Sequence, residues 1–181
     1  MTDTDVLIVG AGPTGLMLAC QLVRRGVRVV IVDRNAGPVR ETRALGVQAR
    51  TLEIYAQLGI VGQALALGTP GGGANLWAGG RRRAWLALGA AGRALCAYPY
   101  ILILGQDDNE RLLGARLAEL GVDVQWHSEL VALDAQADGV TATLRGSHPA
   151  TNHWDLWRVL GQGQEWASSA PGYCLDGRAK G

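Results

Sequence analysis

Three glycines near the start of the chain, Gly10, Gly12 and Gly15, follow the pattern G-x-G-x-x-G. Where this pattern joins a strand to a helix, the first glycine allows a tight turn and the second lets backbone approach a pyrophosphate, while the third lets the helix pack close to the strand. The N-terminus of that helix offers free N–H groups and a positive dipole end to phosphate. With Pro13 and Thr14 in the same turn, the pattern predicts a dinucleotide site.

An acidic residue, Asp33, is separated from Gly15 by seventeen residues. A carboxylate at the end of the second strand can accept both hydroxyl protons of an adenosine ribose, and it repels a 2′-phosphate. The nucleotide is therefore expected to lack that phosphate. The alternative interpretation is a glycine-rich turn in an ordinary α/β protein, which leaves the agreement of turn, helix, spacing and acid unexplained.

The elements that position these residues form a strand–helix–strand unit. Residues 5–10 are a short apolar run typical of a buried parallel strand, residues 16–23 carry apolar side chains at helical spacing, and residues 27–33 are a second β-branched run. Gly26 is expected to end the helix. A helix of this length suits a right-handed crossover between parallel strands, so the unit predicts an α/β fold.

Further along the chain, local patterns predict short strands, two helices and a hairpin. A polar loop over 34–49 precedes a helix over 51–58, and a flexible turn is expected at 68–73. Asp107 or Asp108 is expected to cap a helix that runs to about residue 120. The strand-like segments are 76–77, 84–88, 100–104, 122–126, 129–134 and 140–144, the last entered through a hairpin turn at 137–139.

At Gly146 the pattern changes, because residues 146–181 show neither the strand period nor the helix period. We therefore expect a domain over 1–145, followed by an irregular tail over 146–181 without regular secondary structure. The abrupt change motivates the hypothesis that the tail comes from a truncated or frame-shifted gene.

Composition excludes several classes of protein. The chain has 181 residues, of which 48% are hydrophobic and 18% charged, and its net charge is +1; these values exclude a disordered chain and a polybasic nucleic-acid module. The apolar runs are too short for a membrane span, and the acidic N-terminus does not resemble a secretory signal. Three scattered cysteines do not form a disulfide framework, so we expect a cytoplasmic protein with neither a nucleic-acid nor a membrane partner.

Other residues that could carry chemistry have weaker support. Arg81, Arg82 and Arg83 are expected to form a solvated turn between edge strands rather than an anion site. His148 and His153 have no acid or cysteine nearby that completes a ligand set, so no metal site is predicted. No Ser/His/Asp or Cys/His arrangement has supporting context, and the catalytic residues stay unknown.

Four segments of the sequence match a known family pattern: 5–15, 29–34, 43–59 and 98–113. Through them the chain resembles the FAD-dependent aromatic-ring hydroxylases, single-component flavoprotein monooxygenases similar to para-hydroxybenzoate hydroxylase. The resemblance covers only the N-terminal FAD-binding portion, with a poor match over 68–97. It implies a truncated Rossmann-like FAD-binding fold, a parallel sheet with the βαβ dinucleotide motif plus a small antiparallel β element.

The resemblance also implies roles for individual residues. The glycine turn over 10–15 would face the FAD pyrophosphate, Asp33 would hold the adenine ribose, and Arg34 would lie beside the adenosine. Arg43 would reach the FAD phosphates or ribitol, and its permanently charged guanidinium suits two phosphate oxygens at once. Gln106 would contact the ribityl chain or the flavin. The alternatives, a solvated loop arginine and a polar residue at a helix start, stay open for these last two residues.

By the same resemblance, NAD(P)H reduces the flavin, O2 adds to it, and the resulting hydroperoxide delivers an oxygen atom to a phenolic or otherwise activated ring of a small aromatic substrate. The family has no separate Rossmann unit for NAD(P)H, which agrees with the single G-x-G-x-x-G of this chain. The substrate itself and the choice between NADH and NADPH stay open.

The chain also departs from the family pattern. A strand that ends in Asp-Gly and a later Gly-Asp motif for the ribityl chain do not occur where the family has them. We therefore expect an incomplete flavin and substrate site, weak FAD retention, and no hydroxylation by the isolated chain. A strand missing beside the first strand leaves a sheet edge open, which predicts self-association.

Two alternative functions are consistent with the glycine motif. The first is an NAD-dependent Rossmann dehydrogenase, which requires a catalytic Tyr/Lys pair or His in the second half, whereas the only lysine is Lys180. The second is a non-catalytic nucleotide-binding remnant. It shares every motif with the flavoprotein and differs only in lacking the rest of the flavin and substrate site.

Overall fold

The computed structural model describes residues 4–38, 46–87, 96–135, 140–146, 150–154 and 158–161. The chain divides into two compact units, which are treated separately below. Unit 1 comprises residues 1–38 and 117–181, and unit 2 comprises residues 39–116. Within the described ranges, no helix combines the length and the apolar composition that crossing a membrane requires.

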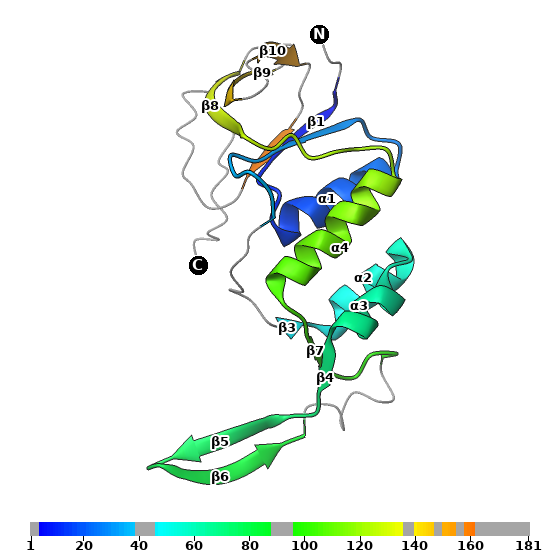
Figure 1. The fold of residues 1–181 in the computed structure, drawn as a ribbon, viewed down its shortest axis with the longest axis vertical. Coiled ribbons are helices and arrows are strands. Elements are labelled where there is room, and N and C mark those ends of the chain that lie inside the picture. Colours follow the sequence, from blue (N-terminus) through cyan, green and yellow to red (C-terminus); the bar gives the residue numbers. More distant parts are fainter. Residues whose placement is uncertain are drawn as a thin grey trace. The chain divides into compact units, whose positions relative to one another are not determined.

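Unit 1 is built on the strand–helix–strand motif that the sequence predicts (Figure 1). Strand β1 (Val6–Val9) pairs in parallel with β2 (Val29–Val32), so that Val6 lies opposite Val29 and Val9 opposite Val32. Helix α1 (Pro13–Val23) connects them. The prediction of two buried parallel strands joined by a helix is thus confirmed.

Helix α1 begins three residues earlier than its apolar spacing predicts, at Pro13. Proline is tolerated there because the first N–H groups of a helix have no partner within the helix, and its fixed φ already suits the helix. The helix ends at Val23, and Gly26 follows with a φ of +77°, a conformation that favours glycine.

The second sheet of unit 1 is antiparallel, with the order β10-β9-β8. It consists of β8 (Ser128–Ala135), β9 (Val140–Gly146) and β10 (Ala150–Trp154). It packs on one face of the parallel sheet through a cluster of buried side chains, namely Leu7, Val30, Val32, Leu130, Ala142 and Leu144. Burying a side chain of this kind contributes about 1.5–3 kcal/mol, so this cluster is a main source of stability in unit 1.

The strand predicted over 122–126 is not present. Only Gln125 bridges to β2, opposite Val32, where its N–H donates to the Ile31 carbonyl oxygen and its own carbonyl oxygen accepts from the Asp33 N–H. The pairing stops there because the chain turns at His127, whose φ is +54°. The apolar and β-branched residues of this segment favour a strand, but the turn leaves room for a single bridge.

Two strands lie within the tail that we expected to be irregular. Strand β10 pairs with β9, and strand β11 (Arg158–Gly161) pairs in parallel with β1, giving the order β11-β1-β2. The side of β1 that we expected to stay open is therefore occupied. Strand pairing satisfies backbone N–H and C=O groups whatever the side-chain period, so the periodicity of the tail did not reveal it. The remaining tail residues lie outside the described ranges, and the boundary at residue 145 stays a prediction.

Unit 2 contains two small sheets and the helices α2 (Ala49–Leu58), α3 (Val61–Leu67) and α4 (Gln106–Glu119), the last of which continues to residue 119 in unit 1. One sheet has the order β3-β7-β4 and consists of β3 (Gly46–Val47), β7 (Ile101–Ile103) and β4 (Thr69–Gly71). The helix predicted over 51–58 and the strand predicted over 100–104 are confirmed with small changes of boundary. Helix α3 was not predicted, and the turn expected at 68–73 contains β4.

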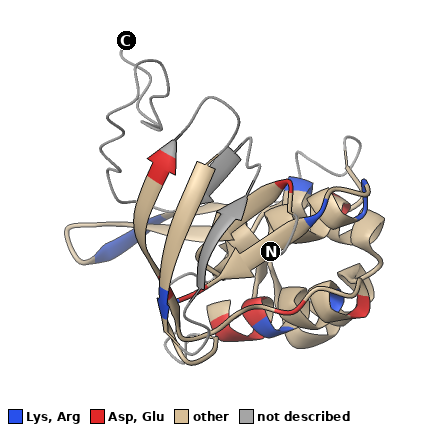
Figure 2. Ribbon diagram, turned by 90° about the horizontal axis from the view of Figure 1, so that it is seen from above, with Lys and Arg blue, Asp and Glu red and all other residues tan. Residues whose placement is uncertain are grey.

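The second sheet of unit 2 is a hairpin of β5 (Ala74–Ala78) and β6 (Arg81–Leu86). Every residue of both strands is exposed, including Trp77 and Trp85. Arg81, Arg82 and Arg83 begin β6 directly after the turn and form the blue segment of this hairpin in Figure 2. The prediction that they form the turn itself is wrong, because Gly79 and Gly80 make the turn and the three arginines belong to β6, although they are exposed to solvent as expected.

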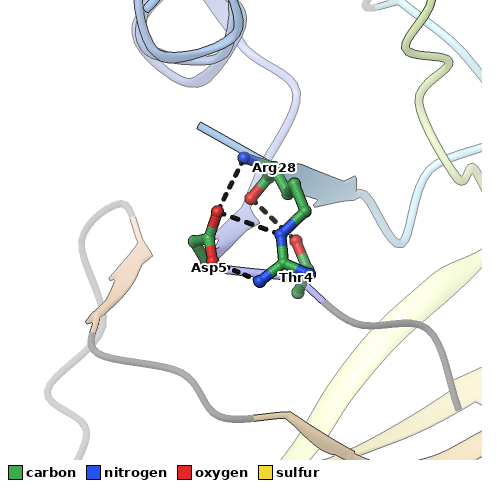
Figure 3. A network of polar contacts seen from close by, with 3 residues as sticks. All are labelled: Thr4, Asp5 and Arg28. Atoms are coloured by element: carbon green, nitrogen blue, oxygen red, sulfur yellow. Dashed lines mark hydrogen bonds and ion pairs between the residues drawn. The ribbon is translucent and has the colours of Figure 1, made fainter. Parts of the chain in front are cut away.

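A polar network ties the starts of β1 and β2 together (Figure 3). The Asp5 carboxylate accepts hydrogen bonds from the Arg28 backbone N–H at 2.9 Å and from the Arg28 guanidinium at 2.6 and 3.2 Å. The Thr4 hydroxyl donates to the Arg28 carbonyl oxygen at 2.8 Å. These hydrogen bonds from Arg28 hold the pKa of Asp5 below the ordinary value of 3.8.

We predict that the Asp5→Asn variant loses a contribution to stability that depends on pH. Because the folded-state pKa of Asp5 is lowered, its contribution is present above pH 3.8 and is lost as the pH falls through the folded-state pKa. The difference in midpoint temperature between wild type and variant should therefore be largest near neutral pH and shrink in acid. Thermal unfolding followed by circular dichroism at several pH values measures it, and a difference independent of pH would contradict the assignment.

Candidate functional site

The glycine turn lies between β1 and α1 in unit 1. Gly10 has a φ of +104°, which favours glycine, and its N–H donates to the Val32 carbonyl oxygen at 2.8 Å. Gly12 is the extended residue that caps α1, and its carbonyl oxygen accepts the first helical hydrogen bond, from Leu16, at 3.0 Å. The N–H groups of the residues before Leu16 therefore have no partner within the helix and are available to an anion.

Gly15 allows the close approach that the pattern predicts. A Cβ atom on Gly15 would lie 2.0 Å from the Gly10 carbonyl oxygen and 3.3 Å from the Cγ2 atom of Ile8. No real Cβ atom tolerates the first of these distances. The third glycine is therefore required by the contact between α1 and the end of β1.

The Asp33 carboxylate lies directly against this turn. Its Oδ2 atom accepts a hydrogen bond from the Ala11 N–H at 2.7 Å, and its Oδ1 atom accepts one from the Asn35 N–H at 2.8 Å. A carboxylate has about four lone-pair positions, so both oxygens can still accept a hydroxyl proton. The predicted proximity of the acid and the glycine turn is confirmed.

The electrostatics of the α1 N-terminus favour an anion. No acidic side chain lies in its first turn, so no residue of the helix itself neutralises the positive end of the dipole, and the Asp33 carboxylate is bound to the Ala11 N–H before the helix begins. Helix α4 differs, because Asp107 and Asp108 lie in its first turn. These aspartates lie inside the helix, which begins at Gln106, and not at the cap position expected from the sequence.

Arg34 lines a cavity of about 520 Å³ in unit 1 that is widely open to solvent. The other lining residues are His127, Glu129, Arg145 and Gly146. Arg145 and Glu129 form an ion pair at 3.7 Å, and Gly146 approaches the His127 carbonyl so closely that a Cβ atom there would overlap its oxygen. The sequence did not predict this group of residues. They meet because the His127 N–H donates to the Asn35 carbonyl oxygen and the Ser128 N–H to the Asp33 carbonyl oxygen, each at 2.9 Å, and because β9 pairs with β8 beside them.

The other predicted site residues belong to unit 2. Gln106 is the first residue of α4, and its Nε2 atom donates to the Glu110 Oε1 atom at 2.8 Å. Arg43 lies outside the described residues. The structure thus brings together the glycine turn and Asp33, and Arg34 follows Asp33 in the chain. Gln106 belongs to unit 2.

The arrangement in unit 1 can bind a molecule that carries both a phosphate and a ribose. Free N–H groups at a helix N-terminus suit the phosphate, and a fixed carboxylate suits two vicinal hydroxyls. Among the described residues, no three His, Cys, Asp or Glu side chains gather into a metal-binding group.

Comparison with known proteins agrees with this geometry. Residues 3–153 match the family model described as "FAD binding domain". The chain is 43% identical over 141 residues to 6-methylpretetramide 4-monooxygenase from Streptomyces rimosus, and 38% identical over 141 residues to rifampicin monooxygenase from Rhodococcus hoagii. Each match covers 78% of this chain but only 25% and 28% of the respective relative. The chain therefore spans about a quarter of the length of these relatives.

Solved structures show the same fold. The anhydrotetracycline hydroxylase OxyS from Streptomyces rimosus matches with a TM-score of 0.75 and 34% identity, covering 88% of this chain and 31% of that chain. An aklavinone-11 hydroxylase solved with FAD and aklavinone matches with a TM-score of 0.75 and 28% identity, covering 86% of this chain and 33% of that chain. The predicted Rossmann-like fold with a small antiparallel element is confirmed.

We predict that Gly15→Ala destabilises the protein by about 2 kcal/mol or more, because its Cβ atom forces α1 away from the end of β1. Gly114→Ala in α4 is the matched control, since a Cβ atom there meets no neighbour within 4 Å. That change should stabilise the protein by roughly 0.5–1 kcal/mol, the helix preference of alanine over glycine. Urea unfolding measures both variants, and equal effects at the two positions would contradict the close approach.

Proposed function

This chain belongs to the FAD-binding domain family, and we propose that its unit 1 binds the ADP half of FAD in a flavoprotein monooxygenase that hydroxylates aromatic or phenolic compounds. The observation that carries the proposal is the hydrogen bond from the Ala11 N–H to the Asp33 carboxylate. It places the only acid at the end of β2 against the turn that precedes α1.

The residues of the turn have distinct parts in the proposed binding of FAD. Gly10 and Gly12, with Pro13 and Thr14, form the backbone that faces the pyrophosphate, and Gly15 holds α1 close enough for its N-terminus to take part. Asp33 accepts hydrogen bonds from the two ribose hydroxyls. Because both of its oxygens are already held by backbone N–H groups, little side-chain freedom is lost when the ribose binds.

Three further residues complete the proposed FAD site. Arg34 contacts the adenosine, and it lies at the open cavity that His127 and Arg145 also line. Arg43 binds the phosphates or the ribitol through its guanidinium. Gln106 contacts the ribityl chain or the flavin.

For the whole protein we propose a reaction in which NAD(P)H, O2, a proton and an aromatic substrate give the hydroxylated product, NAD(P)+ and water. Bound FAD supplies the redox chemistry, and the residues of this chain bind and orient it. The substrate class follows from relatives whose names include 6-methylpretetramide, rifampicin and pentachlorophenol monooxygenases. Cytoplasmic location is proposed because three scattered cysteines are typical of a reducing compartment.

We predict that Asp33→Ala weakens FAD binding by at least about tenfold, because it removes a charged acceptor from both ribose hydroxyls. Titration of the purified chain, followed by quenching of flavin fluorescence, measures the change. Asp123→Asn is the matched control, since Asp123 is an exposed aspartate of the same unit and lies outside the proposed site.

A competition experiment tests the ribose contact without altering the protein. ADP-ribose should displace FAD from the wild-type chain, and its 2′-phosphorylated form should compete about tenfold less well because a second anion meets the Asp33 carboxylate. Equal competition by the two nucleotides would contradict the role of Asp33. A wild-type chain that binds neither FAD nor ADP-ribose would contradict the proposed function itself.

A further inference from the structure

Helix α4 contains, one turn after its start, a buried carboxylate that the proposed FAD contacts do not use. Glu110 is only 1% exposed, and among the described residues it is the only charged side chain that is buried. Burial of a charged group is costly unless hydrogen bonds compensate for lost water. Water does not reach the Glu110 carboxylate, so its burial has to be explained by its contacts within the protein.

The other charges of this turn behave as ordinary solvated groups. Arg111 forms ion pairs with Asp107 at 3.1 Å and with Asp108 at 2.6 Å, and all three side chains are about one-third exposed or more. Exposed pairs of this kind contribute little to stability. Glu110 lies on a different side of the helix, and its position calls for a separate explanation.

Glu110 holds the side chain of Gln106. The two residues are one helical turn apart, which brings their side chains to the same face, and the Gln106 Nε2 atom donates to the Glu110 Oε1 atom at 2.8 Å. The neighbouring amide, Asn109, is used differently, since its Oδ1 atom accepts from the hydroxyl of the buried Tyr55. Gln106 is thus held through its NH2 group and Asn109 through its carbonyl oxygen, each by a buried side chain.

The direction of the Gln106 hydrogen bond sets what this residue can offer to a ligand. A carboxylate only accepts hydrogen bonds, so the NH2 end of the Gln106 amide must face Glu110. The Oε1 end then faces away from Glu110, and no hydrogen bond from a described residue reaches it. A glutamine held in this way is an acceptor, which suits a hydroxyl or an N–H group and not a phosphate or a carbonyl.

We infer that Glu110 is a positioning residue, which fixes the Gln106 amide so that its Oε1 atom accepts a hydrogen bond from a ribityl hydroxyl or the flavin N–H of FAD. The inference rests on the proposed function, in which Gln106 contacts that part of the cofactor. Without Glu110 the Gln106 amide can rotate, and in half of its orientations the NH2 group, instead of Oε1, faces the cofactor.

FAD titration of three variants tests the inference. Glu110→Met should weaken binding roughly three- to tenfold, as Gln106→Ala should, because each removes one oriented hydrogen bond. The double variant should bind no more weakly than the weaker single variant, since both changes remove the same contact. Glu110→Gln keeps an acceptor for Gln106 and should bind close to the wild type. Asp108→Asn, on the solvated side of the turn, is the control and should leave binding unchanged.

A second measurement separates positioning from loss of fold. The side-chain NH2 protons of Gln106, identified by their disappearance in Gln106→Ala, should resonate away from those of a solvated glutamine in the wild type and return to them in Glu110→Met. An unchanged signal, unchanged FAD affinity in Glu110→Met, or additive effects in the double variant would overturn the inference. A wild-type chain that does not bind FAD would contradict the proposed function instead, and the NMR signal then decides the orientation of Gln106 by itself.

Discussion

The hydrogen bond between the Ala11 N–H and the Asp33 carboxylate is the contact on which the arrangement of unit 1 depends. It joins Ala11, which follows β1 and Gly10, to Asp33, the residue directly after β2. Its geometry requires the parallel pairing of the two strands in register, and it requires α1 to lie close enough that Gly15 meets the Gly10 carbonyl. A shift of one residue in that register would move the carboxylate to the other face of the sheet.

The core of unit 1 keeps that register in place from both faces of the parallel sheet. Leu7, Val30 and Val32 face the antiparallel sheet. Ile8, the residue after Leu7 in β1, points to the other face and lies against Gly15 of α1. Because alternate residues of a strand point to opposite faces, an apolar run buried on both sides fits this position. The glycine turn therefore follows a strand that is packed on both of its faces.

The helix N-termini of the two units carry different chemistry. In α1 the first turn has no acid, and its N–H groups are left for an anion. In α4 the first turn has Asp107 and Asp108 on its solvated side, and the pair of Gln106 and Glu110 lies on another side of the helix. The first arrangement suits phosphate, and the second suits the hydroxyl or N–H donors of an uncharged part of a cofactor.

The sequence by itself determined the strand–helix–strand motif, the need for glycine at position 15 and the presence of an acid at position 33, because these follow from periodicity and spacing over a short stretch of chain. It also indicated α2, α4 and the strands β8 and β9, which pair antiparallel, while the turn predicted at 137–139 lies outside the described residues. Only the tertiary structure decided that β11 pairs with β1, that the segment around Gln125 makes a single bridge, and that His127 and Arg145 join Arg34 at one cavity. These features depend on backbone groups and side chains that meet across many residues of sequence, and no local pattern of residue types encodes such a meeting.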